Sequence, residues 1–202
     1  MRVSATILDA FRRWRQYDYV TLGELEAQIR KEYRTTPDME RGTALHAVME
    51  DPEPYRWGWE LIYGDWRFAA AEIDELRGKV SSAVTEIPAS FELAGHTIRC
   101  RVDGMTGLTV QELKCPRKQS YDPDNYLESY QWRIYLLAFE AQTCDYHLVS
   151  LHKPDKSSGV SYIQSHNVVR THRYAGLEAD VKRLLQDFEQ FLWDRNLETY
   201  LE

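Results

Sequence analysis

The most restrictive feature of this sequence is a change in the spacing of its apolar residues near residue 86. Before that point, apolar residues recur every three or four positions, as they do in amphipathic helices. Over 86–93 and 97–103, apolar and polar residues alternate, and Ala94-Gly95-His96 separates the two runs. Two alternating runs joined by a short turn are typical of a β-hairpin. The chain therefore has to combine helices with a sheet.

The same reasoning predicts the remaining elements from their apolar spacing. Helices are expected over 4–16, from a capping-box pair at Thr21 and Glu24, from Pro37 onward, and over 68–79, 124–142 and 175–193. Strands are expected over 86–93, 97–103, 108–114, 145–151 and 160–169, with a turn from Gly104 to Gly107 and an irregular, aromatic-rich connection over 51–66. This order predicts an α/β (α+β) fold, in which helices flank a central mixed β-sheet.

A chain of 202 residues suits one domain with its own hydrophobic core. We expect that domain to span 1–202, with a mostly helical N-terminal part (1–80), a core of sheet and helix (86–170) and a C-terminal helix (174–195). The formal net charge of −7 argues against a protein that coats DNA, but it allows an enzyme with a local basic groove.

Cysteine content and hydropathy limit the compartment and the cofactors. The three cysteines, Cys100, Cys115 and Cys144, are an odd number without paired spacing, which favours reduced thiols inside a cell. They are too few for a zinc ribbon or a four-cysteine iron–sulfur cluster. No apolar run approaches the ~18 residues of a membrane span, and the N-terminus lacks the apolar centre of a signal peptide. We expect a cytoplasmic protein that has no membrane partner.

The third expected strand carries the first sign of chemistry. Glu112 and Lys114 are two residues apart, so both side chains point to one face of a strand. Asp103 ends the preceding strand, and pairing of the two strands would bring it beside Glu112. Two close carboxylates repel each other unless a cation lies between them, and oxygen ligands suit Mg²⁺ or Mn²⁺. Such a cation beside a lysine fits metal-assisted phosphodiester hydrolysis.

The spacing alone is not specific, because Asp180-Val181-Lys182 has it too, on an expected helix. A hairpin turn at Asp103 and a solvated strand face at Glu112 remain the alternative. Two further patterns narrow the choice. Gln131 and Tyr135 are four residues apart on one expected helix, so they face the same way. Upstream, Gly42-Thr43-Ala44-Leu45-His46 places a histidine on another helix, where a lone histidine is usually a core or surface residue.

In this order, the motifs resemble the PD-(D/E)XK nuclease superfamily, and above all its RecB-like and phage-exonuclease branch. The matching residues are Gly42 and His46, then Asp103, then Glu112-Leu113-Lys114, and finally Gln131 with Tyr135. They span about residues 42–135, and the order of strands and helices agrees beyond them. The resemblance implies a restriction-endonuclease-like core.

The resemblance also implies a role for each matching residue. The metal ligands would be Asp103 and Glu112, the backbone carbonyl of Leu113, His46, and Glu86 at the start of the first strand. Lys114 would position and activate the attacking water. Gln131 and Tyr135 would line the site and hold Lys114 or the DNA backbone. Cys115-Pro116 departs from the small polar residue that often follows the lysine. With no flanking set of four cysteines and no phosphate-binding Gly-Lys-Ser/Thr loop, we expect a stand-alone nuclease without an iron–sulfur cluster.

Basic residues near the acid–lysine strand offer contacts for DNA. Between 99 and 118 there are five basic residues and two acidic ones, and we expect Arg99, Arg101, Arg117 and Lys118 to contact phosphates. A second patch or a solvated set of helix faces is formed by Arg12, Arg13, Arg15, Arg30, Lys31 and Arg34. The cluster of Trp57, Trp59 and Trp66 either stacks on unpaired bases or belongs to a core or an interface.

The function expected from the resemblance is a Mg²⁺- or Mn²⁺-dependent deoxyribonuclease that leaves 5′-phosphates. We expect an exonuclease of recombination, repair or phage DNA processing, in a bacterial or phage-infected cell. Its partners would be duplex ends or single strands of DNA and a single-strand annealing or recombination protein, with oligomers allowed. The alternatives are a non-catalytic module that binds DNA or protein on the same fold, and an endonuclease of the superfamily.

Overall fold

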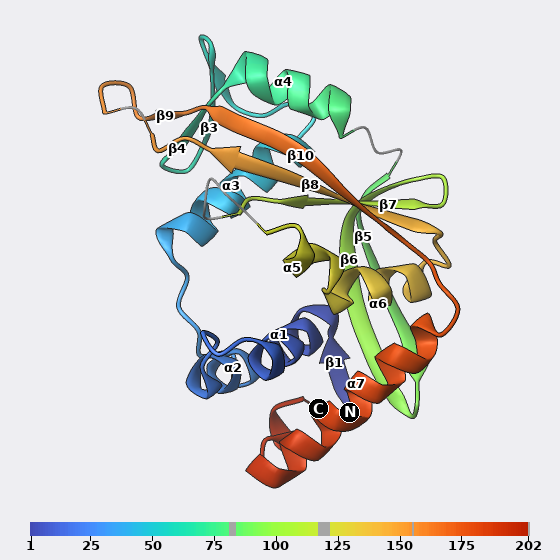
Figure 1. Cartoon of the computed structure of the whole chain (residues 1–202). Helices are drawn as coiled ribbons and strands as arrows, with labels where there is room; N and C mark the ends of the chain where they lie inside the picture. Colours follow the sequence, from blue (N-terminus) through green and yellow to red (C-terminus); the bar gives the residue numbers. More distant parts are fainter. Residues whose placement is uncertain (81–83, 117–121, 155, 202) are drawn as a thin grey trace.

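The computed structural model covers residues 1–202 and describes all of them except 81–83, 117–121, 155 and 202 (Figure 1). Its helices are α1 (Ala5–Gln16), α2 (Leu22–Ile29), α3 (Pro37–Glu50), α4 (Ala70–Lys79), α5 (Asp124–Leu127), α6 (Tyr130–Ala138) and α7 (Leu177–Arg195), with a 3₁₀ turn at Glu198–Leu201. Its strands are β1 (Arg2–Ser4), β2 (Arg56–Trp57), β3 (Glu60–Tyr63), β4 (Trp66–Ala69), β5 (Val84–Leu93), β6 (His96–Thr106), β7 (Thr109–Lys114), β8 (Thr143–Leu151), β9 (Val160–Ser161) and β10 (Ile163–His172).

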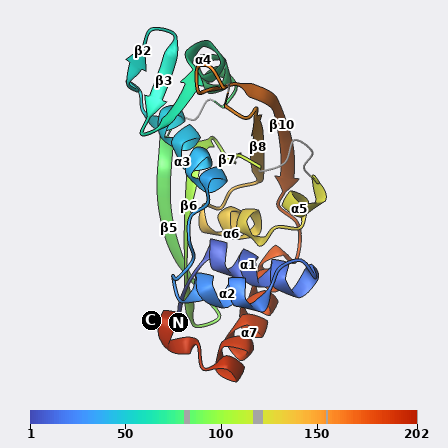
Figure 2. The same cartoon turned by 90° about the vertical axis from the view of Figure 1, so that its left-hand side faces the viewer.

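The main sheet is mixed, as predicted. Its strand order is β1-β6-β7-β8-β10, and β5 also pairs with β6. The β5–β6, β6–β7 and β8–β10 pairs are antiparallel, whereas β1–β6 and β7–β8 are parallel. Helices cover both faces of this sheet (Figures 1 and 2), which confirms the predicted fold class.

Two hydrophobic clusters, one on each face, hold the helices to the sheet. The larger cluster joins α1, α2, α6 and α7 to Val110 of β7 and to Cys144, Tyr146 and Leu148 of β8. The smaller one joins α3, α4 and the β3–β4 hairpin to Leu113, Val149 and Leu151 of the same two strands. Residues of opposite parity point to opposite faces of a strand, so β7 and β8 are covered on both sides.

The aromatic connection predicted over 51–66 is wrong. Strands β2, β3 and β4 form a meander in this region, and β9 completes a second, four-stranded sheet. The helix predicted from residue 68 starts at Ala70, because Phe68 pairs with Leu61 and Ser161 in β4 and is fully buried. Partner strands far away in the sequence decide this region, and its local pattern does not reveal them.

The turn predicted from Gly104 to Gly107 is also wrong. Strand β6 continues to Thr106, which pairs with Thr109, so that the turn is only Gly107-Leu108. Gly107 has a φ of +59°, as the first central residue of a type II′ hairpin turn requires. The register Gly104↔Gln111 follows from this tight turn. It makes Asp103 and Glu112 the next facing pair.

The long helix predicted over 124–142 is two helices, α5 and α6, separated at Ser129. The Ser129 hydroxyl accepts a hydrogen bond from the backbone N–H of Gln131 (3.1 Å) and thereby caps α6. Asp9 of α1 accepts another from the N–H of Tyr130 (2.8 Å). These bonds orient α6 against α1 and the sheet. In the described part of the chain, no helix has the length and apolar character to cross a membrane.

Candidate active site

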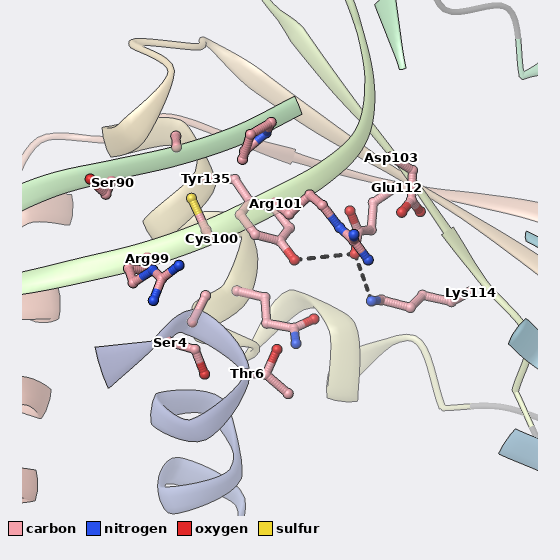
Figure 3. A pocket seen from close by; sticks show the side chains of 14 residues that line it. Ser4, Thr6, Ser90, Arg99, Cys100, Arg101, Asp103, Glu112, Lys114 and Tyr135 are labelled. Atoms are coloured by element: carbon pink, nitrogen blue, oxygen red, sulfur yellow. Dashed lines mark hydrogen bonds and ion pairs between the residues drawn. The ribbon is translucent and has the colours of Figure 1, made fainter. Parts of the chain in front are cut away.

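The predicted convergence of acid, acid and lysine is present at the end of the β6–β7 hairpin. The backbone N–H of Leu113 donates a hydrogen bond to Asp103 Oδ2 (2.6 Å), which ties Asp103 to β7. Lys114 Nζ lies 2.6 Å from Glu112 Oε1, as the dashed line in Figure 3 marks. The two side chains share a face of β7 because they are two residues apart.

Helix α6 adds its two predicted residues from the opposite wall. The Tyr135 hydroxyl donates to Glu112 Oε1 (3.1 Å). Gln131, one turn earlier on α6, lines the same cavity, which has a volume of about 710 Å³. The cavity is also lined by Ser4 and Thr6 at the start of α1, which the sequence reasoning missed. The described site thus spans β6, β7, α6 and α1.

Helix α3 brings His46 to the same place. Its Nδ1 is 3.6 Å from Asp103 Oδ1 and 3.6 Å from Glu50 Oε1. One ligand atom from each of these three residues lies within 4.8 Å of the others, a spacing that could hold a metal ion. The sequence reasoning missed Glu50. Its signal was present, because four residues separate it from His46 and such residues share one face of a helix.

Glu86 lies beside this cluster. Its carboxyl group hydrogen-bonds to Glu50, and it pairs with Arg101 Nε at 2.7 Å. Glu86 has a φ of +51°, in the left-handed region that non-glycine residues adopt rarely and most often at functional sites. Four acidic side chains therefore surround His46 and Lys114.

Burial and like charge have shifted the protonation of these groups. Burial, followed by the charge of Glu112, raises the pKa of Asp103 to about 7. Burial lowers the pKa of His46, but the hydrogen bond to Glu50 and the charge of Asp103 outweigh it, and the pKa is raised. Burial also opposes the charged form of Lys114, yet Glu112 raises its pKa overall. Carboxylates are crowded more closely here than solvation alone would allow.

A divalent cation fits the residues that are present. The second oxygen of Glu112, Oε2, is buried and has no hydrogen-bond partner among the described residues. A buried carboxylate oxygen of this kind requires a ligand or a water. With His46, Glu50 and Asp103 beside it, the donor set is one imidazole and several carboxylates, which suits Mg²⁺ or Mn²⁺.

The predicted DNA contacts fall into three groups. Arg99 and Arg101 line the cavity, whereas Arg117 and Lys118 lie outside the described residues. In the second patch, Arg12 and Arg13 are close to Asp9, Arg15 pairs with Asp187, and Arg30 pairs with Glu26. Of the tryptophans, Trp57 and Trp59 are exposed, while Trp66 packs partly on the core of the smaller cluster.

Comparison with known proteins agrees with the fold. No family model matches the chain, and no curated protein matches its sequence. Among solved structures, an alkaline exonuclease from Laribacter hongkongensis (LHK-Exo) superposes with a TM-score of 0.57 at 15% identity, over 98% of this chain and 90% of that one. The protein SSO0001 gives 0.53 at 17% identity, over 94% and 76%. A Eubacterium rectale protein proposed to be an exonuclease gives 0.51 at 10%, over 98% and 82%.

These matches confirm the predicted restriction-endonuclease-like architecture. The chain has the fold of PD-(D/E)XK nucleases of the phage-exonuclease type, with a mixed central sheet between helices. At these identities the likeness concerns the fold. The chemistry has to be argued from the residues of this chain.

Proposed function

We propose that this protein is a metal-dependent DNA exonuclease that uses Mg²⁺ or Mn²⁺ and leaves 5′-phosphates. The observation that carries the proposal is the meeting of Lys114, Glu112 and Asp103 in one cavity, with His46 3.6 Å from Asp103. The fold, shared with exonuclease structures, supports the same reaction class.

The ligands of the cation would be Asp103, Glu112 and His46, joined by Glu50, the carbonyl of Leu113 and Glu86. A bound divalent cation would supply Lewis-acid stabilisation of the charge that develops on the phosphate. The remaining steps belong to the side chains. The carboxylates exclude competing cations from the basic side of the cavity, and Arg99 and Arg101 at the cavity edge attract the DNA backbone.

Lys114 would position the attacking water and offset negative charge on the phosphate. Its ammonium group is held at Glu112 Oε1, which the Tyr135 hydroxyl also contacts, so the lysine is oriented from two sides. Gln131 would steady the backbone of the scissile strand. Attack by water in line with the bond from phosphorus to the 3′ oxygen breaks that bond. The 3′ oxygen takes up a proton, and the phosphate stays on the 5′ side.

The orientation of Lys114 also bears on the non-catalytic alternative. A module that only binds DNA has no need of a lysine held 2.6 Å from a buried carboxylate. We therefore place the enzyme first. The endonuclease alternative is separated by substrate, because a covalently closed circle has no end for an exonuclease.

The decisive test uses end-labelled linear DNA and closed circular DNA, single- and double-stranded, with Mg²⁺, Mn²⁺ or a chelator. Metal-dependent loss of linear DNA with circles intact is expected, and Lys114→Ala should lower the rate by about 10²–10⁴-fold. The matched control is Lys182→Ala, which removes the lysine of the second acid-x-lysine match, paired with Glu178 on α7. Inertness on every substrate, or full activity of Lys114→Ala, refutes the proposal.

A further inference from the structure

The connection between α2 and α3 has an unusual degree of exposure. We call Lys31–Thr36 the strap. Its residues from Lys31 to Thr35 are all exposed, and none from 32 to 36 belongs to a helix or strand. In an extended segment, successive side chains point to opposite sides. Five consecutive exposed residues therefore mean that both sides of the strap face solvent, and the strap does not lie down on the body of the protein.

The strap joins two parts of the structure that pack separately. Leu25 and Ile29 anchor α2 in the larger hydrophobic cluster, whereas Leu45 and Val48 anchor α3 in the smaller one. Figure 1 shows the strap standing away from the sheet, and Figure 2, from the side, shows it crossing in front of β6. The strap is thus a covalent bridge over the side of the sheet that carries the active site.

The catalytic cavity is built from elements on both sides of this bridge. His46 and Glu50 come from α3, which follows the strap, while Ser4 and Thr6 come from α1, on which α2 packs. A ligand that reaches Asp103 and Glu112 between these walls has the strap across its path.

The strap carries the chemistry that a nucleic acid strand would meet. Lys31 and Arg34 contribute two positive charges, and neither side chain pairs with another described side chain. Tyr33 is 54% exposed and can stack on a base. Arg30, just before the strap, differs, because it is held by Glu26 and lies over the Tyr200 ring. The free cations are the ones above the opening.

The length of the strap limits what can pass beneath it. Seven steps from Arg30 to Pro37, at ~3.3–3.6 Å each, span at most about 25 Å between Cα atoms, before the side chains of α2 and α3 narrow the space. A DNA duplex has grooves about 8.5 and 7.5 Å deep, so it is wider than roughly 16 Å. A single strand fits the space with much less constraint.

We propose that the strap forms a closed arch over the active site, so that the substrate is a single strand of DNA that enters end first. The inference rests on the proposed nuclease function and names its substrate class. It gives exonuclease behaviour a topological cause, because a strand without a free end cannot be threaded.

The test measures topological trapping and does not depend on cleavage. Lys114→Ala in a chelator is mixed with a single strand carrying biotin at both ends, and streptavidin is added after the protein or before it. The complexes are then challenged with 1 M NaCl, about where electrostatic binding is lost. We expect at least about tenfold more retained protein when the caps are added last.

A protease-cleavable strap supplies the matched variant. A site-specific protease sequence is inserted between Tyr33 and Arg34, and in the control between Ala94 and Gly95, in the exposed turn of the β5–β6 hairpin. Cutting the strap should abolish the salt-resistant complex, and cutting the control should not. Equal retention in both orders of addition, retention after the strap is cut, or no binding to the strand at low salt would each overturn the arch.

The two proposals can fail separately. Trapping by a protein whose unmutated form cleaves no DNA would refute the nuclease and leave the arch. Cleavage of linear strands by a protein that is never trapped, or that cuts circular single strands equally fast, would refute the arch and leave the nuclease.

Discussion

Strand β7 carries two buried polar clusters on opposite faces. On one face, Glu112 has one oxygen shared by Lys114 and Tyr135, while its other oxygen has no partner among the described residues. On the other face, Gln111 Oε1 accepts a hydrogen bond from His147 Nε2–H (2.6 Å), and His147 Nδ1 accepts one from His166 Nε2–H (3.0 Å).

The two clusters respond to burial in opposite ways. Burial, with the nearby charge of His166, lowers the pKa of His147 to about 4, so this histidine stays neutral and its hydrogen bonds are complete. Burial and Glu112 raise the pKa of Asp103 to about 7, so like charges are held together without compensation. A satisfied cluster stabilises the sheet, whereas a strained cluster of acids is typical of a site that awaits a cation.

The largest expected difference between the faces is in activity. Glu112→Gln keeps the shape but removes a charge from the acid cluster, and we expect the cleavage rate to fall by about 10²–10⁴-fold with no loss of folding. Steady-state rates and thermal unfolding of the variant measure both. Gln111→Glu is unsuitable as its control, since it buries a new charge, so Gln111→Leu is used. An active Glu112→Gln would place the chemistry elsewhere.

The second expected effect is on stability in acid. In the folded protein His147 titrates near 4, and in the unfolded chain near 6.5, so the unfolded state binds the extra proton first. The stability that His147 contributes is present above about pH 6.5 and is lost as the pH falls towards 4, by up to about 3 kcal/mol. Urea unfolding of the wild type and of His147→Gln at several pH values tests this. Parallel pH profiles would contradict the assignment.

The charged groups around that histidine also have to be followed. Asp145, paired with Arg170, favours the protonated form of His147, while His166 and Lys79 on the neighbouring elements oppose protonation of the pair. Asp145→Asn should therefore leave the direction of the pH effect unchanged. A reversed slope in that variant would mean that Asp145 controls the titration.

A smaller effect is expected when the satisfied cluster loses one partner. Gln111→Leu leaves the His147 Nε2–H buried without an acceptor, which should lower the free energy of unfolding by about 1–3 kcal/mol. Cleavage per folded molecule should stay within a few-fold of wild type. Denaturant unfolding and a rate corrected for active protein are the measurements. A large loss of activity at full stability would show that both faces serve catalysis.

The smallest effect concerns the strained cluster without metal. Asp103→Asn in a chelator at pH 8 removes one of two facing charges but retains an oxygen for the Leu113 N–H. We expect the free energy of unfolding to rise by roughly 1–2 kcal/mol, because burial and Glu112 disfavour the charged aspartate. Added Mn²⁺ should stabilise the wild type more than the variant. A variant less stable than wild type in the chelator would show that Asp103 is structural.

Much of the site was accessible from local spacing. The two-residue period of β7 predicts that Glu112 and Lys114 share a face, and the four-residue spacing on α6 predicts the same for Gln131 and Tyr135. The structure brings these residues into one cavity. Glu50 was missed although its spacing from His46 has the same form, because one acidic residue on a polar helix face carries no signal until its partner strand is known.

The elements that failed are those whose partners are remote in sequence. The second sheet depends on the pairing of β4 with β9, more than ninety residues later. The break at Ser129 depends on a hydrogen bond from Tyr130 to Asp9 of α1. Neither partner can be identified from the residues nearby.

The amino-acid sequence by itself determined which faces of β6, β7 and α6 carry acids, lysine and tyrosine, because backbone geometry repeats every 2.0 or 3.6 residues. Only the tertiary structure decided that α3 lies against Asp103, that the acids become buried enough for the pKa of Asp103 to rise to about 7, and that the strap crosses the same side. The physical reason is that desolvation and charge proximity depend on the distance between segments in space, which local propensities leave open.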